Sequence, residues 1–98
     1  MMRALPQTSE LEAVARHAVW FESPAAALAD PCRFVAHVLT SGTYQDVVAL
    51  RQYVSDQDLE DAIDHAPPGI FDPRSWAYWN LKLGRYPAPP LPTRKFDF

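Results

Sequence analysis

The chain has 98 residues, of which 48% are hydrophobic and 21% are charged. This size supports one domain with a single modest core, and no apolar run approaches the roughly 20 residues of a membrane span. The N-terminal residues lack the continuous apolar segment of a secretory signal, and the one cysteine, Cys32, cannot form an internal disulfide. Both features lead us to expect a cytoplasmic protein without a membrane segment.

The net charge is −3, and the charges are segregated along the chain. Residues 54–72 hold six acids and no Lys or Arg, whereas residues 73–96 hold five bases and no acid. Two explanations are open. The acidic and basic segments complement each other within the fold, or they present a partner with two faces of opposite sign.

The first predicted helix covers residues 10–19. Ser9 and Glu12 form a capping-box pattern at its start. An apolar stripe at helical spacing follows, made of Leu11, Val14, Ala15 and Ala18. Trp20 and Phe21 then predict an apolar hinge, and the pair Ser23-Pro24 favours a short helical turn over residues 25–28.

Asp30 and Pro31 repeat the signal of a capping residue followed by proline. The helix that they start is predicted to end at Gly42. Its periodicity places Arg33, His37 and Thr40 outward and places four residues inward, namely Phe34, Val35, Val38 and Leu39.

Two further helices are predicted before the Pro-Pro-Gly stop at residues 67–69. Thr43 caps the first, with Asp46 in its first turn, and Ser55 caps the second, with Asp58 in its first turn. The buried stripe of the first is Val47, Leu50 and Val54, flanked by Tyr44 and Val48. The stripe of the second is Leu59, Ala62, Ile63 and Ala66, and Ile70 and Phe71 are expected to pack back on the core.

Residues 71–84 (FDPRSWAYWNLKLG) form the segment around which we expect the chain to be organised. Asp72 and Pro73 start a helix and Gly84 ends it. Trp76, Trp79 and Leu83 share one face, opposite Arg74, Tyr78, Lys82 and Arg85. The two indoles predict a central position in one contiguous core with Phe34, Val38, Val47, Leu50, Leu59 and Ile63.

The residues after Gly84 contain too many prolines to continue a helix. Pro87, Pro89, Pro90 and Pro92 favour the extended polyproline II conformation. No stretch alternates with the period of a strand. The sequence therefore predicts an all-α protein: a single compact domain of about five short helices (residues 1–86) and an extended proline-rich C-terminal tail (residues 87–98).

No catalytic, metal-binding or cofactor-binding group of residues is predicted. Cys32 and His37 lie on different faces of one helix, and His17 and His65 are distant in sequence. A helix N-terminus lowers a thiol pKa, but packing beside a buried face is the preferred interpretation of Cys32. The acids of residues 56–64 lack the spacing and glycine of a calcium loop, and no glycine-rich phosphate loop exists. We therefore expect a protein that is not an enzyme.

DNA binding is the first alternative for function, because two short helices joined near Val54 and Ser55 have a helix-turn-helix outline. The second helix would enter the groove, and it carries five carboxylates between residues 56 and 64. Phosphates repel carboxylates, and groove binding rests on Lys and Arg. The bases outside this helix could form a basic patch, but five charges are too few for strong binding. We therefore expect no direct nucleic-acid binding. These bases are Arg74, Lys82, Arg85, Arg94 and Lys95.

A protein partner is favoured instead. Residues 87–90 and 89–92 both match the P-x-x-P pattern, which binds aromatic grooves at little ordering cost. An equally open alternative is that the tail packs on its own Trp and Tyr side chains or is simply disordered. The surface that we predict to bind a partner combines Tyr78, Lys82, Arg85, Tyr86, Leu91, Arg94, Lys95 and Phe96.

Three stretches of the chain also resemble a group of small bacterial proteins encoded beside nucleotidyltransferase-like toxins of the AbiEii type. They are residues 33–54 (RFVAHVLTSGTYQDVVALRQYV), 73–84 (PRSWAYWNLKLG) and 89–96 (PPLPTRKF). The resemblance implies an all-α, antitoxin-like protein that acts by protein–protein contact, and it carries over no catalytic residue. We therefore expect a non-enzymatic protein-binding module, with a DNA-binding regulator of its own operon as the alternative.

Overall fold

A computed structural model describes residues 5–92 of the chain. Within this range the protein consists of helices and contains no strand, which confirms the predicted all-α class. Its helices are α1 (Ser9–Ala18), α2 (Pro24–Ala29), α3 (Pro31–Ser41), α4 (Tyr44–Leu50), α5 (Asp56–Asp64) and α6 (Pro73–Lys82). About five helices were expected. The additional one is α2, which was predicted only as a short turn.

Side-chain capping explains why every described helix begins where it does. The cap of each helix accepts a hydrogen bond from the backbone N–H three residues later, which satisfies one of the unpaired donors of the first turn. These caps are Thr8, Ser23, Asp30, Thr43, Ser55 and Asp72. Proline occupies the first turn of α2, α3 and α6, where its missing N–H costs nothing.

The start of α1 differs from the prediction by one residue. The hydroxyl of Thr8, not that of Ser9, accepts from the backbone N–H of Leu11 at 3.2 Å. Ser9 is instead the first helical residue, so the predicted capping box of Ser9 and Glu12 is wrong. With Thr8 as the cap, Glu10 and Glu12 both lie in the first turn, near the positive end of the helix dipole.

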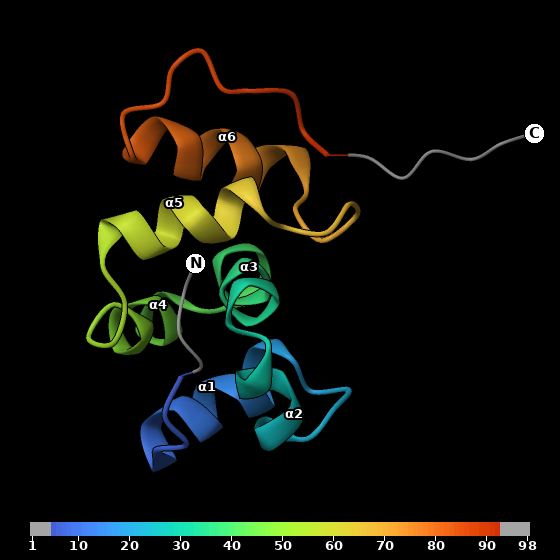
Figure 1. Cartoon of the computed structure of the whole chain (residues 1–98), viewed down its shortest axis with the longest axis vertical. Helices are drawn as coiled ribbons and strands as arrows, with labels where there is room; N and C mark the ends of the chain where they lie inside the picture. Colours follow the sequence, from blue (N-terminus) through green and yellow to red (C-terminus); the bar gives the residue numbers. More distant parts are fainter. Residues whose placement is uncertain (1–4, 93–98) are drawn as a thin grey trace, which may run out of the picture.

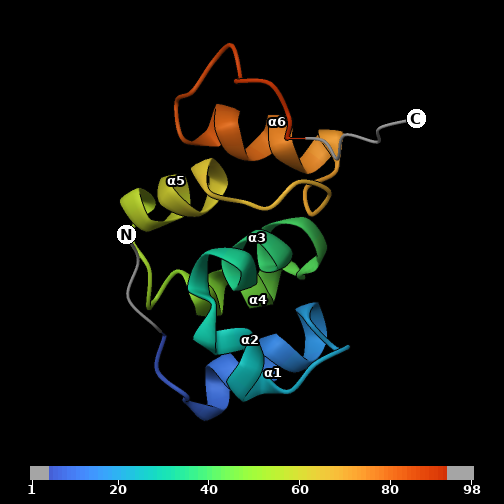
Figure 2. The same ribbon diagram turned by 45° about the vertical axis from the view of Figure 1, so that its right-hand side comes forward.

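The helices form three layers (Figures 1 and 2). Helices α1 and α2 lie at one end, α3 and α4 form the middle, and α5 and α6 lie at the other end. Helix α3 packs against all five other helices, whereas α6 packs against α3 alone among the helices. The expectation that the chain is organised around residues 71–84 is therefore wrong, and α3 holds the central position.

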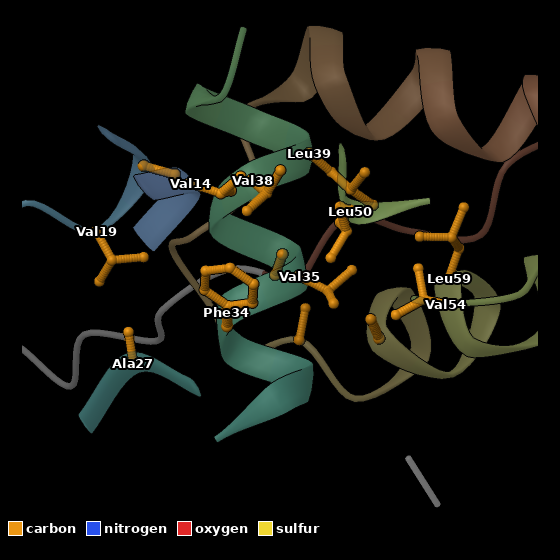
Figure 3. Packing of buried hydrophobic residues seen from close by; sticks show 14 of the residues in the cluster. Val14, Val19, Ala27, Phe34, Val35, Val38, Leu39, Leu50, Val54 and Leu59 are labelled. Atoms are coloured by element: carbon orange, nitrogen blue, oxygen red, sulfur yellow. The ribbon is translucent and has the colours of Figure 1, made fainter. Parts of the chain in front are cut away.

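The central position of α3 follows from its composition. Five of its side chains are buried and they point to more than one side of the helix: Phe34, Val35, Ala36, Val38 and Leu39. A helix with so broad an apolar face must be covered by several other elements. Figure 3 shows Phe34 on the side of α3 toward Val19 and Ala27, and Leu39 on the side toward Leu50.

The buried side chains form one contiguous cluster, as predicted. Of the eight residues named from the sequence, Val47 is partly buried at its edge, and the others belong to it. Leu83 of the predicted tryptophan stripe is also only partly buried. The same face of α6 also carries Asn80, which the prediction did not include. Asn80 is fully buried and donates from Nδ2 to the carbonyl oxygen of Trp76 at 2.9 Å.

Helix α6 is attached to the core by a hydrogen bond that sequence reasoning did not foresee. The buried indole of Trp79 donates from Nε1 to the carbonyl oxygen of Leu39 at 3.0 Å. Leu39 lies in the last turn of α3, where carbonyl groups have no partner within the helix. Trp79 therefore satisfies a buried acceptor of α3 while its ring fills the space beside it.

Truncation of Trp79 should accordingly be severe. We expect Trp79→Ala to lower the free energy of unfolding by about 3–5 kcal/mol, the range for a buried aromatic side chain, and this can be measured by denaturant titration. Tyr78→Ala is the control, because the neighbouring side chain is 55% exposed and should change stability by only about 0.5 kcal/mol. Equal losses in the two variants would show that Trp79 does not anchor α6.

Candidate functional site

A groove lies between the end of α3, helix α4 and helix α6, and it contains two residues of the predicted partner surface. Tyr78 and Lys82 line it from α6, and the opposite wall includes Tyr44 and Val48 of α4. Its volume is about 600 Å³. The remaining lining residues are Leu39, Gly42, Thr43, Val47, Arg51, Gln52 and Trp79, and we call the whole the α4–α6 groove.

The α4–α6 groove exposes apolar surface that its own fold does not cover. Tyr44 is 83% exposed, Val48 43% and Tyr78 55%. The ring of Tyr78 meets the ring of Trp79 edge-on, with 5.2 Å between ring centroids. The buried indole of Trp79 therefore supports the exposed phenol ring of Tyr78. Exposed apolar side chains that gather in a hollow are typical of interaction sites.

The charge of the groove is positive. Its charged lining residues are Lys82 and Arg51, and among the described residues no carboxylate lines it. The Lys82 ammonium lies over the ring of Tyr78, 5.9 Å from the centroid. Arg51 donates to the exposed carboxylate of Asp56 at 2.7 Å, just outside the groove. The groove is thus suited to a ligand that is apolar and acidic.

The structure separates the other predicted partner residues from this groove. Arg85 donates from Nη2 to the Asp64 carboxylate at 2.6 Å, so it turns toward α5 instead of sharing a face with Tyr78. Tyr86 is 82% exposed, and Leu91 is partly buried against the core. Arg94, Lys95 and Phe96 lie outside the described residues.

The acidic and basic segments complement each other within the fold at one place, where Asp64 of α5 pairs with Arg85. This contact agrees with the first of the two explanations offered by the charge pattern. Asp56, at the other end of α5, pairs instead with Arg51, which lies outside both segments. The pair with Asp64 also removes Arg85 from the basic patch that nucleic-acid binding would need.

The first half of the proline-rich tail runs along α6 (Figure 1). The indole of Trp76 donates from Nε1 to the carbonyl oxygen of Pro89 at 2.7 Å. Ala88 and Leu91 are partly buried and pack against the core. Residues 87–92 thus contact their own domain, which is the arrangement that the sequence left open beside partner binding.

A second hollow, which the sequence did not predict, lies beside Trp20 and Phe21. Arg33, His37 and Ser41 line it from one face of α3 at spacings of four residues. The linker after α1 and the loop before α6 form its walls. Its volume is about 660 Å³, and its other lining residues are His17, Ala18, Trp20, Phe21, Pro67, Pro68, Gly69 and Ile70; we call it the aromatic pocket.

The Arg33 side chain, which lines the aromatic pocket, is paired with a carboxylate outside the lining. Arg33 binds Glu22 with both terminal nitrogens, at 2.6 and 3.2 Å. The hydrogen bonds from Arg33 lower the pKa of Glu22 from its usual range, and Glu22 in turn raises the pKa of Arg33. Burial and, next, the positive charge of Arg33 lower the pKa of His37, which is therefore neutral at neutral pH.

His17 is oriented by a contact between two distant helices. Its Nδ1 lies 3.4 and 3.3 Å from the two carboxylate oxygens of Asp46. Asp46 is almost fully buried because it also completes the capping box of α4, where its Oδ2 accepts from the backbone N–H of Thr43 at 3.0 Å. The sequence showed Asp46 as a helix-start residue only, since a contact across 29 positions leaves no local pattern.

The surroundings of Cys32 do not favour a reactive thiol. Burial and the Asp30 carboxylate raise the pKa of the Cys32 thiol, which disfavours the reactive thiolate. Cys32 is partly buried against the core, in agreement with its interpretation as a packing residue. Across the described range no three His, Cys, Asp or Glu side chains come together as a metal site.

Comparisons of the chain with protein-family models, with curated proteins and with solved structures found no match. None of the helices between residues 5 and 92 has the length and apolar character needed to cross a bilayer.

The lowered pKa of His37 predicts a pH dependence of stability. In the unfolded chain His37 has its ordinary pKa of 6.5, so below that pH the unfolded state binds more protons than the folded state. His37 should therefore cost stability as pH falls through 6.5 toward its lower folded pKa. We expect the stability advantage of wild type over His37→Gln to shrink between about pH 7.5 and 5.5 in urea titrations. Because the two proteins share every other titratable group, the contributions of those groups cancel when the two unfolding free energies are subtracted. A difference that stays constant with pH would contradict the prediction.

Truncation of the tail should reveal the contact of Trp76 with Pro89. Deleting residues 88–98 leaves the indole N–H without that acceptor and uncovers part of the core, so we expect the melting temperature to fall by roughly 4–8 °C, or about 1 kcal/mol. Deleting residues 93–98 alone is the control, and the difference between the two reports on residues 88–92. Identical melting temperatures would show that this segment does not contribute to the fold.

Proposed function

We propose that the protein is a non-enzymatic protein-binding module that receives an acidic, amphipathic segment of a partner protein in the α4–α6 groove. The observation that carries the proposal is the exposure of Tyr44 and Tyr78 on facing walls of one hollow, with Lys82 beside them. Tyrosine combines a large contact area with a directed hydroxyl, and it is over-represented among residues that dominate binding energy.

The chemistry of the groove supports a specific kind of ligand. An amphipathic helix binds a groove by placing its apolar side chains in the hollow at helical spacing. The apolar floor and the tyrosine walls suit such side chains, and Lys82 suits a carboxylate at the edge of the same helix. Charge of this kind mainly raises the association rate and the specificity of the complex.

We further propose that the partner is a nucleotidyltransferase-type toxin and that this protein is its antitoxin-like counterpart. The support is the resemblance carried by residues 33–54 and 73–84. Every lining residue of the α4–α6 groove lies in one of these two stretches. The DNA-binding alternative has less support, because Asp64 engages Arg85 and the carboxylates of α5 dominate the surface that would enter a groove.

The decisive experiment is co-purification with the nucleotidyltransferase that we expect to be encoded beside this protein. Wild type should bind it, and the double variant Tyr44→Ala/Tyr78→Ala should lose about tenfold or more in affinity, as for hot-spot residues. Leu81→Ala is the matched control, since Leu81 is 62% exposed on α6 but does not line the groove.

The outcomes separate the two parts of the proposal. If wild type binds the nucleotidyltransferase and the double variant binds equally well, the groove is not the interface. If wild type does not bind it at all, the antitoxin assignment is wrong. Lys82→Glu should in addition weaken binding more at low salt than at high salt, because screening reduces the effect of an exposed charge.

A further inference from the structure

The contact between α6 and residues 87–92 has the features of a ligand bound to a recognition surface. The indole of Trp76 donates from Nε1 to the carbonyl oxygen of Pro89 at 2.7 Å. The ring of Phe71 meets the Trp76 ring edge-on, with 5.4 Å between centroids and 70° between the ring planes. Both rings are buried. The indole is therefore held in place with its N–H directed at the proline-rich segment.

The side chains of residues 87–92 alternate between exposed and covered with a period of three residues. Pro87 and Pro90 are exposed. The two residues that follow each of them are partly buried: Ala88, Pro89, Leu91 and Pro92. Polyproline II has three residues per turn, so one edge of the segment faces solvent while the other two lie on the domain. Proline favours this conformation because it fixes its own φ and biases the preceding residue toward extended backbone.

The attachment of residues 87–92 is separate from the attachment of α6. The chain just before them is held by Arg85, whose backbone N–H donates to the carbonyl oxygen of Asn80 at 2.7 Å and whose guanidinium pairs with α5. Among the described residues, the Trp76 indole supplies the only hydrogen bond between residues 87–92 and the rest of the chain. Four of these six residues are prolines without an N–H to donate. The segment can therefore leave the domain while α6 stays in place.

We propose that the face of α6 around Trp76 is a binding site for proline-rich segments of partner proteins, and that residues 87–92 occupy it as an intramolecular competitor. Aromatic surfaces that bind polyproline II work in this way, since the ligand is extended before binding and loses little entropy. Neither Trp76 nor residues 87–92 line the α4–α6 groove. The site therefore does not depend on the function proposed for that groove.

The segment that fills the site also describes the ligand. It consists of two pairs of an apolar residue followed by proline, Ala88-Pro89 and Leu91-Pro92, separated by one residue that faces solvent. The carbonyl oxygen of the first pair accepts from the Trp76 indole. A partner segment with the pattern apolar-Pro-x-apolar-Pro reproduces these contacts, whatever side chain stands at x.

The tethered competitor regulates access to the site. A short linkage gives a tethered segment an effective concentration in the millimolar range. A free segment that makes the same contacts must reach that concentration before it displaces residues 87–92. A change that weakens the contacts of residues 87–92 should therefore open the site to a free peptide.

The test uses the full chain and acetyl-PAPPLP-amide, a free copy of residues 87–92, followed by calorimetry and melting curves. Leu91→Asp weakens the intramolecular ligand, because it places a carboxylate against the core. This variant should melt below wild type, bind the peptide about tenfold or more tightly than wild type does, and regain stability as peptide is added. Pro90→Asp is the matched control, since it adds the same charge at an exposed position, and it should melt and bind as wild type does.

The role of the indole is tested by adding Trp76→Phe to the Leu91→Asp variant. This change keeps an aromatic ring but removes the N–H donor, and we expect peptide affinity to fall about fivefold or more. If Leu91→Asp does not fold, Leu91→Ala takes its place, because it removes the apolar contact without adding a charge.

Three results would each overturn the proposal. The first is no saturable binding of the peptide, at millimolar concentration, to a folded Leu91 variant. The second is equal peptide affinity with and without Trp76→Phe. The third is equal binding of acetyl-PAPPDP-amide or of an uncharged Gly-Ser hexapeptide, which would show that the surface does not select the apolar-proline pairs.

Discussion

The structure depends on the need to cover helix α3. Buried side chains point to several sides of this helix, so it is stable only when other elements surround it. The surrounding helices are 6 to 10 residues long, and helices of that length are marginal in water by themselves. Each therefore gains its stability from contact with α3 or its neighbours, and the fold forms as one cooperative unit.

The way in which α3 is covered also creates the two hollows. At its C-terminal end α4 and α6 diverge, with Leu39 between them, and this opens the α4–α6 groove. Along its polar edge, Arg33 and His37 face the linker after α1, and this opens the aromatic pocket. The same hub helix thus borders both hollows, and Lys82 lines the α4–α6 groove whereas Arg33 lines the aromatic pocket.

Electrostatic contacts tie the connecting segments to this framework. Glu22, in the linker between α1 and α2, is held by Arg33 of α3, and Arg85, just after α6, is held by Asp64 of α5. Single ion pairs near the surface contribute little free energy, but each of these connects a loop to a helix. The pair of Arg33 with Glu22 thereby holds the linker beside the aromatic pocket. The hydrogen bond of Trp76 with Pro89 connects residues 87–92 to α6 in the same way.

The sequence by itself determined the local structure. Caps, prolines and apolar stripes predicted the all-α class, five of the helices and nearly all of the core, because these signals act within a few residues. Only the tertiary structure decided which helix is central, that Asp46 contacts His17, and that Tyr44 of α4 faces Tyr78 and Lys82 of α6. Those arrangements join residues far apart in the chain, and a periodic pattern shows which side of a helix is buried but not which partner covers it.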